Sequence, residues 1–290
     1  MKFYGLLDLT QRRGIRLECK EITKYYLINA FTNEEFKGNP ASVVLLTADK
    51  SEGWMKSFAK EIKQPITAFI SLTNNNAYQL RWFTPTQEID LCGHGTLGAA
   101  HVLWSEGIVR ETAINFHTKS GILKTELSGH QIMMRLKIKE SCPIDVSVKL
   151  QQVFNFPIKA AAWAEDRYII EFENENIIHN VEPDYELIKE LNGLGIIITS
   201  RGLGKYDFVS RYFAPKIGIK EDFVTGSAHC ALASYWSKLL NKADFTAYQD
   251  SERGGEIKLG VVEDTVELIG ECVTLLRGQI CIGGENNIVA

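Results

Sequence analysis

Apolar and polar positions follow two different periods that alternate along the chain from Tyr25 onward. Short runs such as 25–31 (YYLINAF) and 41–46 (ASVVLL) are rich in aromatic and β-branched residues, which predicts strands. Residues 49–63 place apolar side chains at helical spacing between polar ones, which predicts an amphipathic surface helix. Further strands are predicted over 67–72, 78–84, 112–118, 121–127 and 131–138, with a turn over 73–77.

A stretch near 140–146, with a proline and loose polar residues, interrupts this pattern, as is typical of a domain boundary. A second series of elements follows it. The series begins with a short helix over 145–154 and includes a helix over 182–191. Its strands are predicted over 160–164, 167–172, 195–200, 208–213, 245–249, 256–261, 265–270 and 273–280.

Two short patterns indicate that the series are related. Residues 81–85 (RWFTP) and 211–215 (RYFAP) share the order Arg, aromatic, Phe, any residue, Pro. Each is followed by a Gly/Ser/Thr turn and an apolar helix that ends in a tryptophan, Trp104 in one and Trp236 in the other. The agreement of motif and order predicts a duplicated α+β domain.

Both of these helices are apolar nearly all round, so each must be covered on every side by the strands of its own half. The predicted fold class is α+β, with two pseudo-symmetric domains, each a curled, mostly antiparallel sheet around a central apolar helix. We expect an N-terminal extension over 1–23, a first domain over 24–142 and a second over 143–277. The last strand, near 278–290, is a candidate to return to the first domain. Under a pseudo-twofold axis the two helix N-termini can meet at a cleft, where a ligand would bind.

Composition narrows the class of protein. Hydrophobic residues make up 45% and charged residues 23% of the chain, as in ordinary soluble globular proteins. A net charge of −4 without a basic run argues against nucleic acid or an anionic membrane as the main partner. No apolar run approaches the ~20 residues of a membrane helix and no signal-peptide core is present, so we expect a cytoplasmic protein. The six cysteines form no CxxC motif and match no zinc-site spacing, so no metal site is expected.

The starts of the two apolar helices have the chemistry of an anion site. A helix N-terminus exposes unpaired N–H groups and about half a positive charge. Gly93, Gly95 and Gly226 let a ligand approach the backbone. Thr225 and Ser227 add hydroxyl donors, and two such ends in opposition suit a small carboxylate or an enolate. For one helix alone, Gly and Ser could simply be good helix-starting residues.

Three segments resemble the signature segments of the phenazine-biosynthesis PhzF-like isomerases: 36–46 (FKGNPASVVLL), 83–104 (FTPTQEIDLCGHGTLGAAHVLW) and 221–236 (EDFVTGSAHCALASYW). That family shares a fold superfamily with diaminopimelate epimerase, and the resemblance covers roughly residues 25 to 290. It implies a catalytic cleft between two domains, chemistry without a cofactor and often a homodimer. The implied reaction removes a proton beside a carboxylate or carbonyl and returns it to another position or face.

The resemblance also implies site residues, carried over by position. The family's active-site histidine, aspartate and serine correspond to His94, Asp222 and Ser227. The backbone of the three glycines then lies along the substrate, and Asn39 matches a substrate-binding asparagine of the epimerases. The family's general base, a glutamate, is replaced here by Ile66, which cannot take a proton.

Several groups could replace the missing base. Asp222 ranks first, although it could be an ordinary carboxylate at a helix start. Cys92 occupies the place of an epimerase thiol, and a helix N-terminus lowers a thiol pKa. Aligning the two helix-ending tryptophans puts Val224 opposite Cys92, which excludes a two-thiol mechanism and favours a small residue packed under the turn. His94 is expected to be a neutral donor, because the helix dipole disfavours its cation.

Other polar residues near the motifs have structural readings. Glu88 could act in catalysis or could hold its turn, while His101 and His229 are expected to pack in the core.

Three hypotheses about function therefore remain, in order of preference. The first is an isomerase or epimerase of a small carboxylate metabolite. The second is a small-molecule binding protein that has lost turnover with Ile66, and the third is a thiol-dependent enzyme using Cys92.

Overall fold

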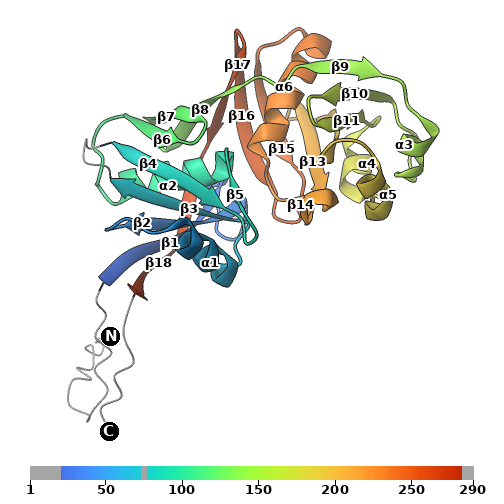
Figure 1. Cartoon of the computed structure of the whole chain (residues 1–290). Coiled ribbons are helices and arrows are strands. Elements are labelled where there is room, and N and C mark those ends of the chain that lie inside the picture. Colours follow the sequence, from blue (N-terminus) through green and yellow to red (C-terminus); the bar gives the residue numbers. More distant parts are fainter. Residues whose placement is uncertain (1–20, 73–76, 283–290) are drawn as a thin grey trace, which may run out of the picture.

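The computed structural model describes residues 21–72 and 77–282 (Figure 1). Its first elements are β1 (Glu21–Ala30), β2 (Asn39–Leu46), α1 (Glu52–Ile62), β3 (Ile66–Leu72), β4 (Tyr78–Phe83), β5 (Glu88–Ile89), α2 (Gly93–Ser105), β6 (Ala113–Thr118), β7 (Gly121–Ser128) and β8 (Gln131–Lys137). The next are β9 (Ser141–Ile144), α3 (Val148–Gln152), β10 (Ala160–Ala164), β11 (Arg167–Glu171), α4 (Glu175–Asn180), α5 (Tyr185–Glu190), β12 (Gly195–Arg201) and β13 (Phe208–Ala214). The last are β14 (Ile219–Asp222), α6 (Gly226–Leu240), β15 (Asp244–Gln249), β16 (Gly255–Val262), β17 (Thr265–Gly270) and β18 (Cys272–Ile282).

The strands form one continuous sheet that curls into two halves with the same pairing pattern. β1/β2 and β10/β11 are antiparallel, and β2/β3 and β11/β12 are parallel. β3/β4 and β12/β13 are antiparallel, and β4/β6 and β13/β15 are parallel. The predicted α+β fold of two pseudo-symmetric domains is thereby confirmed.

The two halves exchange strands where they join. β8 pairs with β17 antiparallel, while β9 pairs with β10 and β18 pairs with β1 (Figure 1). We call β1 to β8 with β18 the N-terminal half, and β9 to β17 the C-terminal half. On these pairings we propose that β9 belongs to the second domain and β18 to the first.

Each half wraps its own apolar helix. A Cβ added to Gly98, in the middle of α2, would lie 3.5 to 3.6 Å from Val43, Ala41 and Ile28 on β2 and β1. In the other half, Trp236 of α6 stacks on Phe208 with ring centroids 5.7 Å apart. Each fully buried Leu or Val side chain of these helices contributes about 1.5–3 kcal/mol through burial. The amphipathic helix α1 packs its buried face on the outside of the N-terminal sheet, and α3, α4 and α5 lie outside the C-terminal sheet (Figure 1).

The structure differs from the sequence expectations at β1 and at α4. β1 begins at Glu21 rather than near Tyr25, and residues 1–20 of the predicted extension lie outside the described residues, as does most of the turn at 73–77. Helix α4 was not predicted, because its six residues carry only two apolar side chains; Asn174 caps it by accepting from the Ile177 N–H at 3.2 Å. Within residues 21–72 and 77–282, no helix has the length and apolar content needed to cross a membrane.

Candidate functional site

The N-termini of α2 and α6 meet. A Cβ added to Gly93 would lie 3.7 Å from the Cα of Gly226, and one added to Gly226 would lie 3.8 Å from the Cα of Gly93. The contact is reciprocal, as expected for residues related by a twofold axis. Both helices therefore direct their unpaired N–H groups and positive dipole ends at one place.

The contact also fixes which residues of the two helix starts are equivalent. Cys92 and Thr225 are the N-caps, and His94 and Ser227 each stand one residue after the touching glycines. The predicted equivalence of Cys92 with Val224 is therefore wrong by one residue. The argument against a second thiol is unchanged, because Thr225 cannot supply one.

Matching ion pairs hold the turns that lead into the helices. Arg81 binds both carboxylate oxygens of Glu88, at 2.7 and 2.8 Å, and Arg211 binds those of Glu221, at 2.7 and 2.9 Å. The hydrogen bond from Arg81 is the main cause of the lowered pKa of Glu88. Of the two readings of Glu88 left open by the sequence, this geometry supports the structural one.

Asp222 is held at the junction by both halves. Its carboxylate accepts hydrogen bonds from Asn39 Nδ2 of β2 at 2.7 Å and from Thr225 Oγ1 at 2.5 Å, one on each oxygen. Gln249 Nε2 donates to the main-chain oxygen of Asp222 at 2.6 Å. A carboxylate oxygen accepts more than one hydrogen bond, so both oxygens can still take a proton from a ligand.

His94 and Cys92 lie side by side at the start of α2. The His94 Nδ1 is 3.5 Å from Cys92 Sγ, and Cys92 Sγ accepts from the Gly95 N–H at 3.4 Å. Burial lowers the pKa of His94, and the charge of Asp222 opposes this only in part, so the imidazole is neutral near pH 7. Burial raises the pKa of Cys92 to about 12, which outweighs the hydrogen bond from Gly95. A protonated thiol that caps the helix fits this better than a catalytic thiolate.

Ile66, at the position of the family's glutamate, is the first residue of β3 and is only 1% exposed. It belongs to the core cluster that also contains Ala41, its partner on β2, and Trp82. The buried Trp82 Nε1 and Asn39 Oδ1 have no hydrogen-bond partner among the described residues. This wall of the junction therefore has an unused donor and an unused acceptor, but no base at position 66.

Arg167 is a site residue that the sequence reasoning missed. It begins β11, is 5% exposed, and donates from Nη1 to Ser227 Oγ at 3.1 Å. The adjacent Asp-Arg pair before a buried strand was the available signal, but nothing local connects it with a serine 60 positions later.

The two other histidines considered in the sequence, His101 and His229, also have defined contacts. His229 is fully buried with Nδ1 2.9 Å from Thr225 O, as core packing predicted, whereas His101 is half-buried and bonded to Thr274 at 2.9 Å.

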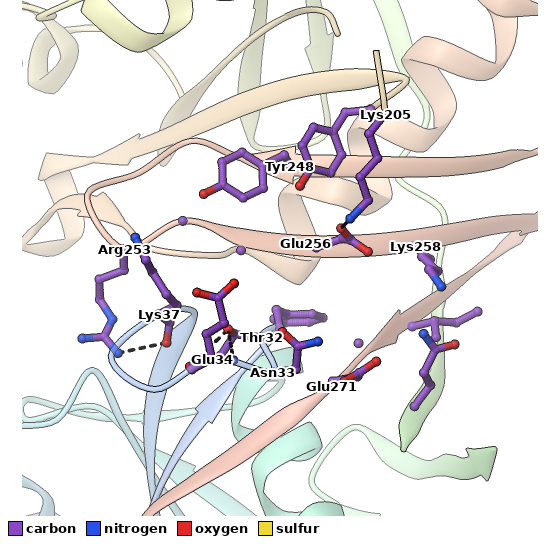
Figure 2. Close-up of a pocket in the computed structure, with 17 residues that line it drawn as sticks. Thr32, Asn33, Glu34, Lys37, Lys205, Tyr248, Arg253, Glu256, Lys258 and Glu271 are labelled. Atoms are coloured by element: carbon purple, nitrogen blue, oxygen red, sulfur yellow. Dashed lines mark hydrogen bonds and ion pairs between the residues drawn. The ribbon is translucent and has the colours of Figure 1, made fainter. Parts of the chain in front are cut away.

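A separate cavity of about 210 Å³ is lined by residues of both halves (Figure 2). Its wall includes the loop after β1 and the start of β16, where Arg253 donates to Lys37 O at 3.0 Å and Lys205 pairs with Glu256. None of the site residues predicted from the sequence lines it. Phe31, on the cavity wall, lies between it and the helix tips, because a Cβ on Gly226 would come 3.9 Å from the Phe31 ring.

Comparison with known proteins agrees with the resemblance seen in the three motifs. The model of a family described as phenazine biosynthesis-like protein, PhzC-PhzF, matches residues 28–278. An uncharacterized isomerase of Halalkalibacterium halodurans is 41% identical over 90% of this chain and 99% of its own. A PhzF-family crystal structure from Enterococcus faecalis superposes with a TM-score of 0.85 at 36% identity, over 90% of this chain and 99% of that one.

The likeness of fold extends further than the likeness of sequence. A hydroxyproline epimerase from Agrobacterium vitis superposes with a TM-score of 0.60 at 8% identity, over 92% of this chain and 94% of that one, which shows a shared fold alone. The family match and the relative above are similarities of sequence, the relative at 41% identity, and each covers most of the chain. The chain therefore belongs to the PhzC-PhzF family of phenazine biosynthesis-like proteins.

Proposed function

We propose that this protein is a cofactor-independent isomerase or epimerase that moves a proton on a small carboxylate-containing metabolite at the junction of α2 and α6. The observation that carries the proposal is the reciprocal contact of the two helix N-termini beside the carboxylate of Asp222. The names of curated relatives, three of which are called uncharacterized isomerases, support the same class of reaction.

In this proposal each part of the site has one task. The N–H groups around Gly93 and Gly226 bind the substrate carboxylate and stabilise the negative charge that forms when the proton leaves, while Gly95 lets the substrate approach the backbone. Asp222 takes the proton, and the C–H electron pair moves into the adjacent carboxylate or carbonyl as an enolate. Neutral His94 donates a hydrogen bond to the enolate, and the protonated Asp222 returns the proton at a different position. For return to the opposite face, His94 gives its ring proton while its other ring nitrogen accepts the proton held by Asp222. Asn39 and Thr225 orient the Asp222 carboxylate.

A second candidate function is a binding protein without turnover, and a specific observation favours it. Ile66 places a buried aliphatic side chain where the family has its base. The anion site at the helix tips does not depend on that base, so ligand binding and proton transfer are separable here. The homodimer and the cytoplasmic location stay predictions; sedimentation velocity would measure the first.

Proton exchange in heavy water distinguishes the two functions. We expect the wild-type protein to introduce deuterium at one carbon of a substrate found among small amino, hydroxy and unsaturated carboxylates, measured by proton NMR. Asp222→Asn should abolish the exchange, while Asp244→Asn, at an exposed aspartate, should leave it unchanged. If wild type binds carboxylates without exchange and Ile66→Glu gains it, the binding function holds. Exchange that survives Asp222→Asn would exclude Asp222 as the base.

A further inference from the structure

A buried arginine contacts one of the two polar side chains at the helix tips. The Arg167 guanidinium binds both oxygens of Asp166, through Nε at 2.7 Å and Nη2 at 3.0 Å, and Nη1 donates to Ser227 Oγ at 3.1 Å. The ring of Tyr212 lies beneath it, 5.1 Å from the guanidinium carbon. Three contacts therefore fix the orientation of the guanidinium, and this fixes the position of its bond to Ser227.

We propose that Arg167 is a positioning residue that makes the Ser227 hydroxyl an obligatory donor toward the substrate, so that the site selects a carboxylate over the matching carboxamide. The inference rests on the proposed function, because it concerns how the same site recognises its ligand. It assigns to Arg167 a role that acts through Ser227 and not through direct contact with the substrate.

The chemistry of the two groups supports this role. A guanidinium has donors only, so Ser227 Oγ must be the acceptor of their hydrogen bond. The hydroxyl hydrogen of Ser227 is then left over, and no acceptor takes it within residues 21–72 and 77–282. A hydroxyl that accepts from a cation is also polarised into a stronger donor. A carboxylate oxygen and a carboxamide oxygen can both accept this hydrogen, but the second group of the carboxamide is an NH₂ donor, which cannot accept from the other donors at the helix tips as the second carboxylate oxygen can.

The N-terminal half shows that the fold itself does not require this arginine. The first pair of β2 and β3 in register is Ala41 with Ile66, and the corresponding pair of β11 and β12 is Arg167 with Gly195. Arg167 thus takes the place of an alanine. Across the twofold axis from Ser227 stands His94, whose neutral ring can either donate or accept. Of these two equivalent side chains, Ser227 therefore is the one with a donor of fixed direction.

The pairing with Asp166 explains why an arginine can stand here. The guanidinium charge is balanced by the neighbouring carboxylate, whose pKa the Arg167 hydrogen bond helps to lower. The helix tip consequently gains direction for one hydroxyl and little net positive charge. A lysine would supply the same charge without the planar fork that holds Asp166 and Ser227 together.

The test compares binding of propionate and propionamide, two probes of nearly equal shape, by ligand-observed NMR titration of the full chain. Wild type should prefer propionate. Ser227→Ala removes the hydroxyl group and should reduce the preference about tenfold, as expected for the loss of one hydrogen bond to a charged group. Arg167→Gln should lose a similar factor and Arg167→Lys less. In the Ser227→Ala background, Arg167→Gln should cause no further loss. Arg135→Gln, at an exposed arginine paired with Glu267, is the matched control and should keep the preference.

The outcomes separate the two proposals. A preference that survives in Ser227→Ala, or losses from Arg167→Gln and Ser227→Ala that add independently, would overturn the role of Arg167 while leaving the proposed function intact. Absence of propionate binding to wild type would remove the anion site and both proposals with it. A merely structural arginine would weaken both probes equally, so the ratio of the two affinities is the deciding measurement. If Arg167→Gln does not fold, Ser227→Ala and Arg167→Lys decide the question.

Discussion

Replacing Ile66 by glutamate would place a carboxyl group in the core beside the helix tips. The wild-type side chain is 1% exposed, so the variant loses about 1.5–3 kcal/mol of apolar burial. Burial also disfavours the charged form of the new side chain. If its pKa rises above 7, keeping it protonated at pH 7 costs ~3.7 kcal/mol relative to an exposed glutamate with pKa near 4.3. A hydrogen bond from the unpartnered Trp82 Nε1 would offset about 1 kcal/mol of this.

The pH dependence isolates the ionisation cost from the packing cost. Ile66→Gln has the same shape and hydrogen-bonding capacity without a titratable group, so it is the matched control. Below pH ~4 the two variants should be equally stable, because the carboxyl is protonated in both the folded and the unfolded state. As pH rises above the unfolded pKa, the unfolded chain loses its proton first. The free energy of unfolding of the glutamate variant should then decrease relative to that of Ile66→Gln by ~1.4 kcal/mol per pH unit until the folded pKa is reached.

Urea denaturation followed by tryptophan fluorescence, at half-unit steps from pH 4 to 8, measures this difference. The expected gap between the two variants is roughly 3–4 kcal/mol at pH 7, a large fraction of a typical domain's stability. A gap that stays flat across the range would refute the reasoning, since it would mean that water reaches position 66.

Three further results are expected. Gly95→Ala should destabilise the fold by about 1–3 kcal/mol, because the new Cβ would lie 2.9 Å from Trp82 Cδ1. Gly93→Ala, whose new Cβ has its nearest contact at 3.5 Å, should leave stability nearly unchanged and weaken ligand binding. Equal losses of stability in denaturation of the two variants would contradict this. Burial lowers the pKa of His229 from 6.5 to about 4, so only the unfolded state gains this proton as pH falls between those values. The free energy of unfolding should therefore drop by about 2 kcal/mol from pH 7 to pH 5. Urea titrations of His229→Gln should lack this drop. Glu88→Gln and Glu221→Gln should each cost about 1–3 kcal/mol by thermal and chemical unfolding, and a clear inequality would contradict their equivalence.

The sequence predicted the elements whose cause is local. The two central helices were identified because an apolar pattern without a polar stripe requires cover on all sides, and the sheets indeed wrap them. The repeated Arg-aromatic-Phe motif was informative because each copy places an arginine against a glutamate at the next turn. The motif occurs twice because both halves hold the equivalent turn with the same kind of ion pair.

Other features depend on contacts between distant segments. Asn39 and Asp222 are 183 positions apart, and their hydrogen bond follows only from how the halves join. The misplaced equivalence of Cys92 had a different cause. The alignment assumed that the two tryptophans mark the same helix position, but Gly93 precedes Trp104 by one residue more than Gly226 precedes Trp236. The touching glycines, at the axis, are the correct reference point, and only coordinates reveal them.

The duplication separates scaffold from chemistry at the junction. Positions that agree in the two halves, such as the touching glycines and the Arg–Glu pairs, build the paired helix starts. The positions that differ carry functional groups: Asp222 pairs with Tyr212 where Ile89 pairs with Trp82. A symmetric junction could bind an anion but could not distinguish the two faces of a substrate. Because moving a proton from one position to another requires that distinction, the differences between the halves are where the reaction must be sought.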